Sequence, residues 1–139
     1  MPPKVLKIAT ACLLDEAGRI LVVRKRGTHV FMLPGGKTEA GETPLTALRR
    51  ELQEELNLKM RESQLQSLGH FQARAANEPD HWVEADVFVG QLTEEVRAQA
   101  EIEALDWLEL QAQHRIRLAP LLREQVLPAL ILRLAAEEY

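Results

Sequence analysis

The stretch LPGGKTEAGETPLTALRRELQEELNL, residues 33–58, decides the fold of this chain. It contains the pair Gly35-Gly36, passes through an acidic loop, and continues from Pro44 with a leucine every three or four residues. Because an α-helix turns by about 100° per residue, these leucines fall on one side of a helix. The stretch therefore predicts a glycine bend followed by an amphipathic helix. The leucines expected to face the core are Leu45, Leu48, Leu52 and Leu56.

Both ends of the predicted helix carry typical end signals. Thr43 is a good N-cap, and Pro44 fits the first helical position, where its missing N–H costs no hydrogen bond. Asn57 tolerates the left-handed backbone conformation with which many helices end. Gly35 and Gly36 indicate a sharp bend or a close approach to the backbone, so a bare carbonyl or amide there could touch a metal or a phosphate.

A row of glutamates lies beside the apolar stripe of this helix. Glu51 and Glu55 are four residues apart, and like charges at this spacing destabilise a helix by a few tenths of a kcal/mol. Glu54 lies just beyond them. Mg²⁺ prefers oxygen ligands and leaves positions open for water and substrate phosphate, so a divalent metal site would explain the row. The alternative is a solvated acidic face on an ordinary amphipathic helix.

The stretch resembles the Nudix box, whose pattern is G-x5-E-x7-R-E-U-x-E-E-x-G-U with U apolar. Asn57 departs from the pattern at its second glycine, a mild change because asparagine also adopts the left-handed conformation. The resemblance implies the α/β Nudix fold, an α/β/α sandwich in which helices flank a mixed β-sheet. The positions that match are Gly36, Glu42, Arg50, Glu51, Leu52, Glu54, Glu55 and Leu58.

The resemblance also implies roles for the matching residues and a divalent cofactor, Mg²⁺ or Mn²⁺. Arg50 would hold the catalytic glutamates, Glu51 among them, in position, and Glu42 would brace the loop or reach a metal through water. Gly36 would lie next to the substrate phosphates. The groups expected to bind the metal are the Gly35 carbonyl and the side chains of Glu51, Glu54 and Glu55.

A catalytic base and a phosphate-binding arginine are expected outside the box. In MutT-like relatives a glutamate some way before a tryptophan reaches into the site, and Glu101 aligns best with it. Glu103 is the close alternative, and Glu54 is the rival for the same role. Related proteins often place a phosphate-binding arginine shortly before the glycine pair, so Arg24 or Arg26 could hold the substrate phosphates. The alternative is that the basic residues 24–26 are ordinary surface charges.

The composition is that of an ordinary globular protein. Its 139 residues, 46% hydrophobic and 27% charged, suit a single domain over residues 1–139. A net charge of −4 argues against a general nucleic-acid binder and against binding to anionic membranes. The lone cysteine, Cys12, excludes an internal disulfide and is expected in the core. The N-terminal MPPKVLK lacks the apolar region of a signal peptide, so a cytoplasmic location is expected.

The rest of the chain predicts further strands and one more helix. Residues 93–100 are polar and could form a short helical turn or a mobile loop. Residues 120–139 are typical of a helix that Pro128 kinks or restarts, too short and interrupted to span a bilayer. This order supports a mixed sheet covered by helices. Strands are expected at residues 6–14, 19–25, 30–33, 64–75, 82–92 and 102–110.

Three aromatic side chains follow the box. Phe71, His81 and Trp82 could stack on a nucleobase. The favoured interpretation instead places Phe71 and Trp82 in the core.

The expected function is metal-dependent hydrolysis of the pyrophosphate bond in a nucleoside diphosphate-linked substrate. A MutT-like nucleoside triphosphate pyrophosphatase is favoured; sugar nucleotides, dinucleoside polyphosphates and capped RNA are the alternative substrates. Residues 73–77 lack the proline of ADP-ribose enzymes and the tyrosine of dinucleoside polyphosphate enzymes. Alternatives from other classes are a nucleotide-sensing module without turnover and a plain interaction protein. The apolar C-terminal helix or a strand edge could form a homodimer.

Overall fold

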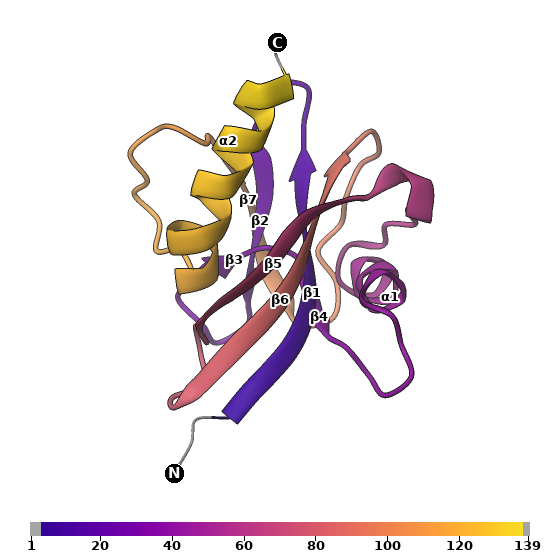
Figure 1. Cartoon of the computed structure of the whole chain (residues 1–139), viewed down its shortest axis with the longest axis vertical. Coiled ribbons are helices and arrows are strands. Elements are labelled where there is room, and N and C mark those ends of the chain that lie inside the picture. Colours follow the sequence, from indigo (N-terminus) through magenta and orange to yellow (C-terminus); the bar gives the residue numbers. More distant parts are fainter. Residues whose placement is uncertain (1–3, 138–139) are drawn as a thin grey trace.

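The computed structural model describes residues 4–137, in which seven strands form one sheet between two helices (Figure 1). Residues 1–3 and 138–139, the ends of the predicted domain and of its predicted last helix, lie outside the described part. The strands are β1 (Lys4–Leu14), β2 (Ile20–Lys25), β3 (Phe31–Met32), β4 (Gly35–Lys37), β5 (Gln66–Arg74), β6 (His81–Gln91) and β7 (Ile102–Leu108). The helices are α1 (Pro44–Leu56), a 3₁₀ turn η1 (Glu62–Gln64), a π-helical turn η2 (Leu121–Val126) and α2 (Leu127–Glu137).

The sheet is mixed, as predicted. Its order is β3-β2-β1-β6-β5, and β4 and β7 add to β1 and β2 respectively. Strands β1 and β6 run parallel along their full length, while the other strand pairs are antiparallel. Strand β4, formed by the glycine pair and Lys37, was not predicted: a bend was expected there, and the segment also pairs with residues 8–10 of β1.

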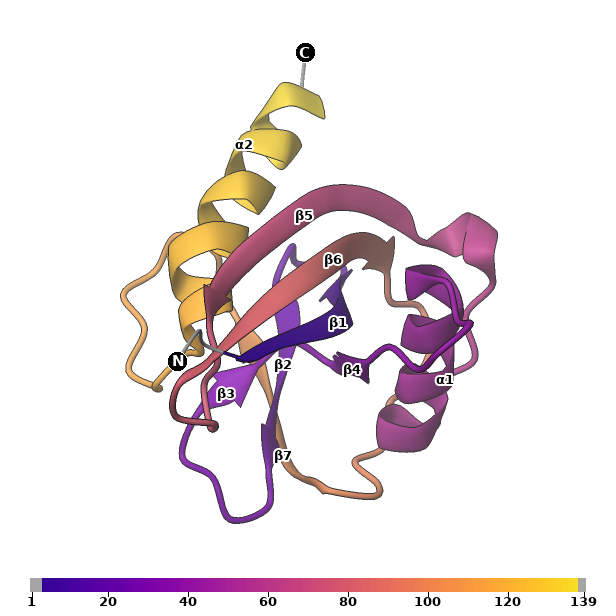
Figure 2. The same ribbon diagram turned by 60° about the horizontal axis from the view of Figure 1, so that its bottom comes forward.

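Helices α1 and α2 cover opposite faces of the sheet (Figures 1 and 2). A hydrophobic core lies under each of them. Alternate side chains of a strand point to opposite faces. On β1, Ala9 and Leu13 therefore pack towards α1, while Cys12 and Leu14 pack towards α2. Burial raises the pKa of the Cys12 thiol to about 12, consistent with the predicted core residue. The α/β/α sandwich is confirmed.

Helix α1 begins and ends where its sequence predicts. The Thr43 hydroxyl accepts a hydrogen bond from the Thr46 N–H at 3.1 Å, and Pro44 is the first helical residue. Asn57 ends the helix in the left-handed conformation, with φ 53° and ψ 37°. The apolar stripe is buried at Leu48, Leu52 and Leu56 and partly buried at Leu45. One face of α1 is thereby fixed against the sheet, and its glutamates lie along the border of that face.

The C-terminal helix starts again at the predicted proline. Residues Leu121–Val126 form a π-helical turn, and the α-helical geometry of α2 begins at Leu127, one residue before Pro128. Proline has no N–H with which to continue the ladder of helical hydrogen bonds, which explains the change of helical geometry at this point. The turn places Leu121 and Leu122 on the sheet.

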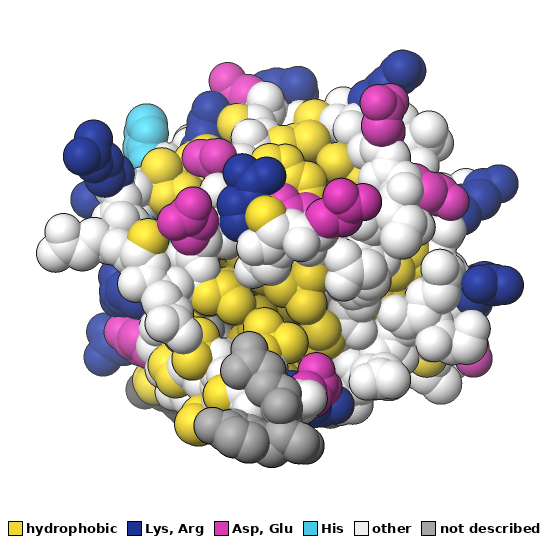
Figure 3. All heavy atoms as spheres, turned by 90° about the horizontal axis from the view of Figure 1, so that it is seen from above, with side chains coloured by type: hydrophobic (Ala, Val, Ile, Leu, Met, Phe, Trp, Pro, Cys, Tyr) yellow, Lys and Arg dark blue, Asp and Glu magenta, His cyan; other side chains and the backbone are white. Residues whose placement is uncertain are grey.

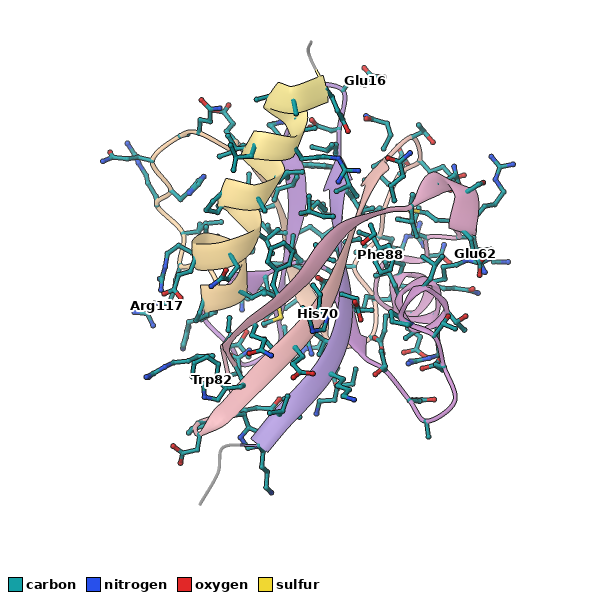
Figure 4. The ribbon with its side chains drawn as sticks, viewed as in Figure 1. Glu16, Glu62, His70, Trp82, Phe88 and Arg117 are labelled. Carbon is teal, nitrogen blue, oxygen red and sulfur yellow. The ribbon has the colours of Figure 1, made fainter. Side chains whose placement is uncertain are left out.

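The two aromatic residues expected in the core behave differently. Phe71 is partly buried and packs against the core under α2, as predicted. The prediction for Trp82 is wrong: its side chain is 38% exposed at the start of β6, near the β5–β6 turn (Figure 4). The Arg74 guanidinium lies 5.9 Å from the Trp82 ring centre, so a cation–π contact replaces core packing. Residues 93–100, for which a helical turn was one alternative, contain none.

The surface carries mixed charges. Seen from the end at which α2 terminates, acidic and basic side chains alternate around exposed hydrophobic ones (Figure 3). On α2, Leu132 is 73% exposed, and a homodimer through this helix stays a prediction. Over residues 4–137, every helix falls short of the length and apolarity needed to cross a membrane.

Candidate functional site

A cavity of about 430 Å³ lies alongside β1, between β4 with α1 and the η2 turn. One part of its wall is apolar, and another is charged. The apolar side chains include Leu6, Ile8, Met32, Leu33, Val83, Leu121 and Leu122. The charged side chains are Glu51, Glu54, Glu78, Glu101, Lys25, Lys37 and Arg74. A cavity of this kind can hold an apolar group beside a group that carries several charges.

Glu55 lies buried next to this cavity, with 6% of its surface exposed. Its Oε1 accepts a hydrogen bond from the Gly35 N–H at 3.0 Å. Burial raises the pKa of Glu55 to about 7; the Gly35 hydrogen bond lowers that pKa, and the nearby Glu51 carboxylate raises it. A buried carboxylate with one hydrogen bond is poorly compensated as an anion, and a cation beside it would relieve that cost.

Glu51 lies against the backbone of Gly36. A Cβ atom added at Gly36 would be 2.5 Å from the Glu51 Cδ, so only glycine leaves room for this carboxylate. At Gly35, which has φ 139°, an added Cβ would lie 2.1 Å from the Ala9 carbonyl oxygen. Burial raises the pKa of Glu51, while the hydrogen bond and the charge of Arg50 lower it. The two glycines therefore have separate roles, one in strand pairing and one in admitting Glu51.

Arg50 connects the acidic loop to the helix. Its Nε and Nη2 each donate to the Glu42 carboxylate at 2.9 Å, and its Nη1 donates to Glu51 at 2.8 Å. The hydrogen bonds from Arg50 lower the pKa of Glu42 to about 2. Glu54, 56% exposed, lies 3.8 Å from the same guanidinium. Arg50 thus links Glu42 in the acidic loop to Glu51 on α1.

The two candidate bases near the start of β7 differ in their surroundings. Glu101 lines the cavity, next to the start of β7. Glu103, two residues further, forms an ion pair with Arg24 at 3.3 Å. The Arg24 guanidinium also donates to the Thr28 carbonyl at 2.9 Å. Of the two glutamates, only Glu101 is brought together with Glu51 and Glu54 at the cavity wall.

The structure brings Lys25 to the cavity wall rather than Arg24 or Arg26, its neighbours in sequence. The period of the strand explains this difference. On β2, Leu21 and Val23 pack towards α1, so the next residue on that face is Lys25. The alternation of β2 was visible in the sequence, but Lys25 was not predicted as a site residue. Lys37 and Arg74 are further cations at the cavity wall that were not predicted.

Thr10 contributes an unsatisfied polar atom to the cavity wall. It is 5% exposed, and its Oγ1 is the one buried side-chain oxygen or nitrogen in residues 4–137 that lacks a hydrogen-bond partner. A buried hydroxyl without a partner costs about 1–3 kcal/mol.

The residues present suit a divalent cation by their donor chemistry. Glu51, Glu54 and Glu55 offer hard oxygen ligands, and the raised pKa values of Glu51 and Glu55 reflect a cost that a nearby positive charge would remove. Among residues 4–137, no group of three or more His, Cys, Asp or Glu side chains is placed so that it could hold a metal ion.

Solved structures of similar fold identify the class of fold. The MutT NUDIX hydrolase from Burkholderia pseudomallei matches with a TM-score of 0.69, over 82% of this chain and 90% of that one, at 23% identity. The NUDIX domain family model matches residues 5–130, and the chain belongs to this family.

Two curated relatives are similar over shorter stretches. The 8-oxo-dGTP diphosphatase of Haemophilus influenzae is 37% identical over 62 residues, which cover 42% of this chain and 46% of that protein. The RNA pyrophosphohydrolase of Halorhodospira halophila is 48% identical over 44 residues, covering 32% of this chain and 24% of that protein. The chain thus spans less than half the length of these relatives.

Proposed function

We propose that this protein is a divalent-metal-dependent hydrolase that cleaves the pyrophosphate bond of a nucleotide. The observation that carries the proposal is the meeting of Glu51, Glu54 and Glu101 at one cavity wall, with Glu55 buried behind Gly35. Four carboxylates and three cationic side chains line the cavity. A diphosphate beside these carboxylates needs positive charge around it, which the three cationic side chains and a bound divalent cation would supply together.

The proposed metal ligands are the side chains of Glu51, Glu54 and Glu55 and the carbonyl of Gly35. When bound, Mg²⁺ or Mn²⁺ neutralises phosphate charge and makes a bound water more acidic. Arg50 holds Glu51 through their 2.8 Å contact and braces the loop through Glu42. This arrangement keeps the ligand side chains in place before the substrate arrives.

The residues of the chain then carry out the proton transfer and hold the substrate. Water attacks a phosphorus atom of the diphosphate, its proton passes to the Glu101 carboxylate, and the bond from that phosphorus to the bridging oxygen breaks. The leaving phosphate departs with the electron pair of that bond. Lys25 and Lys37, at the cavity wall, balance the phosphate charges. Glu54 is the alternative base.

The proposed substrate is a nucleoside triphosphate, hydrolysed to a nucleoside monophosphate and pyrophosphate. The apolar wall that contains Leu6, Ile8 and Val83 suits the flat face of a nucleobase. Similarity to an 8-oxo-dGTP diphosphatase supports this class, and similarity to an RNA pyrophosphohydrolase supports 5′-triphosphorylated RNA as the second candidate. Arg24 or Arg26 remains a proposed contact for the substrate phosphates.

An assay of phosphate and pyrophosphate release over a nucleotide panel tests the proposal. The panel should include nucleoside triphosphates, their 8-oxo forms, sugar nucleotides, dinucleoside polyphosphates and 5′-triphosphorylated RNA, each with Mg²⁺ and after chelation. Turnover that requires Mg²⁺ is expected. Binding without turnover would favour a sensor, and neither binding nor turnover would favour an interaction protein; both results would overturn the proposal.

A further inference from the structure

We infer that Gln99 is a positioning residue for the proposed base Glu101, an inference that rests on the function proposed above. The segment 97–99 lies across the C-terminal end of α1 and donates hydrogen bonds to its last carbonyls. Two residues after Gln99, the chain presents Glu101 to the cavity. Gln99 therefore connects the helix that carries the proposed metal ligands to the residue that takes the proton.

The last four carbonyl groups of an α-helix have no partners within the helix. In α1 all four accept hydrogen bonds from the segment 97–99: the Gln99 side chain serves two, its backbone N–H a third, and the Arg97 N–H the fourth. Gln99 thus binds the turn that carries Glu54 and Glu55. The carbonyls are those of Gln53 and Glu54, at 3.0 and 3.1 Å from Gln99 Nε2, of Glu55, at 2.9 Å from Gln99 N, and of Leu56, at 3.1 Å from Arg97 N.

The backbone between Gln99 and Glu101 has an unusual conformation. Ala100 has φ 53°, in the left-handed region that a residue with a Cβ rarely adopts. The Ile102 N–H closes the turn on the Gln99 carbonyl at 3.0 Å, and the Arg26 N–H donates to the Glu101 carbonyl at 2.8 Å. Strain of this kind persists where the surrounding structure fixes the chain. Gln99 fixes one side of the turn, and Arg26 fixes the other.

The separation of Glu54 and Glu101 depends on the hydrogen bonds between Gln99 and the end of α1. Glu54 lies on α1, and Glu101 lies on the turn before β7, so no continuous element holds them at a set separation. Gln99 bonds to the helix end and precedes Glu101 by two residues. A displacement of about 1 Å at a catalytic group can cost about 100-fold in rate.

The variant Gln99→Glu tests this role on the intact chain. It keeps the size of the side chain but removes both donors and places a carboxylate at the negative end of α1. With the substrate found in the nucleotide panel, kcat should fall about 100-fold while KM stays within about threefold. Gln113→Glu, the same charge change in an exposed loop, should leave both constants unchanged. An unchanged kcat in Gln99→Glu would overturn the inference.

A double-mutant cycle separates positioning from a general structural effect. If Gln99 acts through Glu101, adding Gln99→Glu to Glu101→Gln should lower kcat no further than Glu101→Gln alone. If the two losses multiply, the inference fails while the proposed function stands. A wild-type protein without turnover would overturn both. Should Gln99→Glu not fold, Gln99→Ala, which keeps the backbone hydrogen bond, takes its place in the same cycle.

Discussion

The carboxylate of Glu55 accepts a hydrogen bond from the Gly35 N–H at 3.0 Å and so ties the last turn of α1 to the glycine bend. The pair is twenty residues apart in the sequence and buried in the fold. Burial raises the pKa of Glu55 to about 7. The hydrogen bond therefore holds a proposed metal ligand in place, while the burial of Glu55 makes the stability of the metal-free protein depend on pH.

We expect the free energy of unfolding of the metal-free protein to fall as pH rises from about 4 to 8. Between the unfolded pKa of 4.5 and the folded pKa of about 7, folded Glu55 holds a proton that the unfolded chain has released, so rising pH favours unfolding. The shift corresponds to about 3 kcal/mol. The glutamine of Glu55→Gln cannot titrate but still accepts a hydrogen bond from the Gly35 N–H. The free energy of unfolding of this variant should therefore lack the pH dependence that Glu55 causes.

Urea denaturation of both proteins at pH 4 and pH 8, with metal removed, measures the effect. The stability of the variant relative to the wild type should rise by about 3 kcal/mol between the two pH values. A relative stability that does not change with pH would contradict the raised pKa of Glu55.

Two threonines should respond to valine substitution with opposite signs. Thr10→Val removes a buried hydroxyl that has no partner and should raise the free energy of unfolding by about 1 kcal/mol. Thr43→Val removes the N-cap oxygen that accepts from the Thr46 N–H and should lower the free energy of unfolding by about 1 kcal/mol. Thermal or urea unfolding checks both. A loss of stability in Thr10→Val would show that its hydroxyl has a partner.

Replacing Gly35 by alanine should mainly lower stability, while replacing Gly36 by alanine should mainly lower activity. Gly35→Ala places a Cβ 2.1 Å from the Ala9 carbonyl oxygen, a backbone atom that cannot move freely, so a loss of more than about 3 kcal/mol is expected. Gly36→Ala meets the Glu51 carboxylate, a side chain that can move. This variant should fold with little loss of Tm but lose at least about tenfold in kcat. Equal stability losses in the two variants would refute this distinction.

Arg50→Lys should weaken the link between the acidic loop and α1. Lysine cannot reproduce the paired hydrogen bonds to Glu42, so a lower free energy of unfolding is expected. The pKa of Glu42 should also rise from about 2 towards its ordinary value, which an NMR titration of its carboxyl carbon would detect. Arg123→Lys, at an exposed arginine, is the matched control. A Glu42 pKa that stays low would contradict the assigned partner.

Features that depend on local sequence were predicted well. The ends of α1 follow from Thr43, Pro44 and Asn57, because caps and prolines act within one turn. The buried stripe of α1 follows from the helical period, and the mixed sheet follows from the order of the elements. The match to the box predicted the family to which the chain belongs.

Features set by distant contacts could not be predicted. Strand β4 has two glycines in three residues, so no alternation of side chains marks it. Trp82 lies near a turn where an arginine covers its ring, and hydrophobicity alone predicts burial there. The contact of Gln99 with α1 spans more than forty residues, and a polar loop gives no sign of its partner.

We propose that the exposed Glu54 of α1 acts in chemistry and not in folding, and Glu54→Gln tests this proposal most directly. Because Glu54 is 56% exposed, its replacement should change the free energy of unfolding by less than about 0.5 kcal/mol. With Mg²⁺ and the best substrate of the panel, kcat should fall by about 1,000-fold or more, and Glu94→Gln in the exposed loop should leave it unchanged. Retained activity in Glu54→Gln, or a matching loss of stability, would contradict the claim.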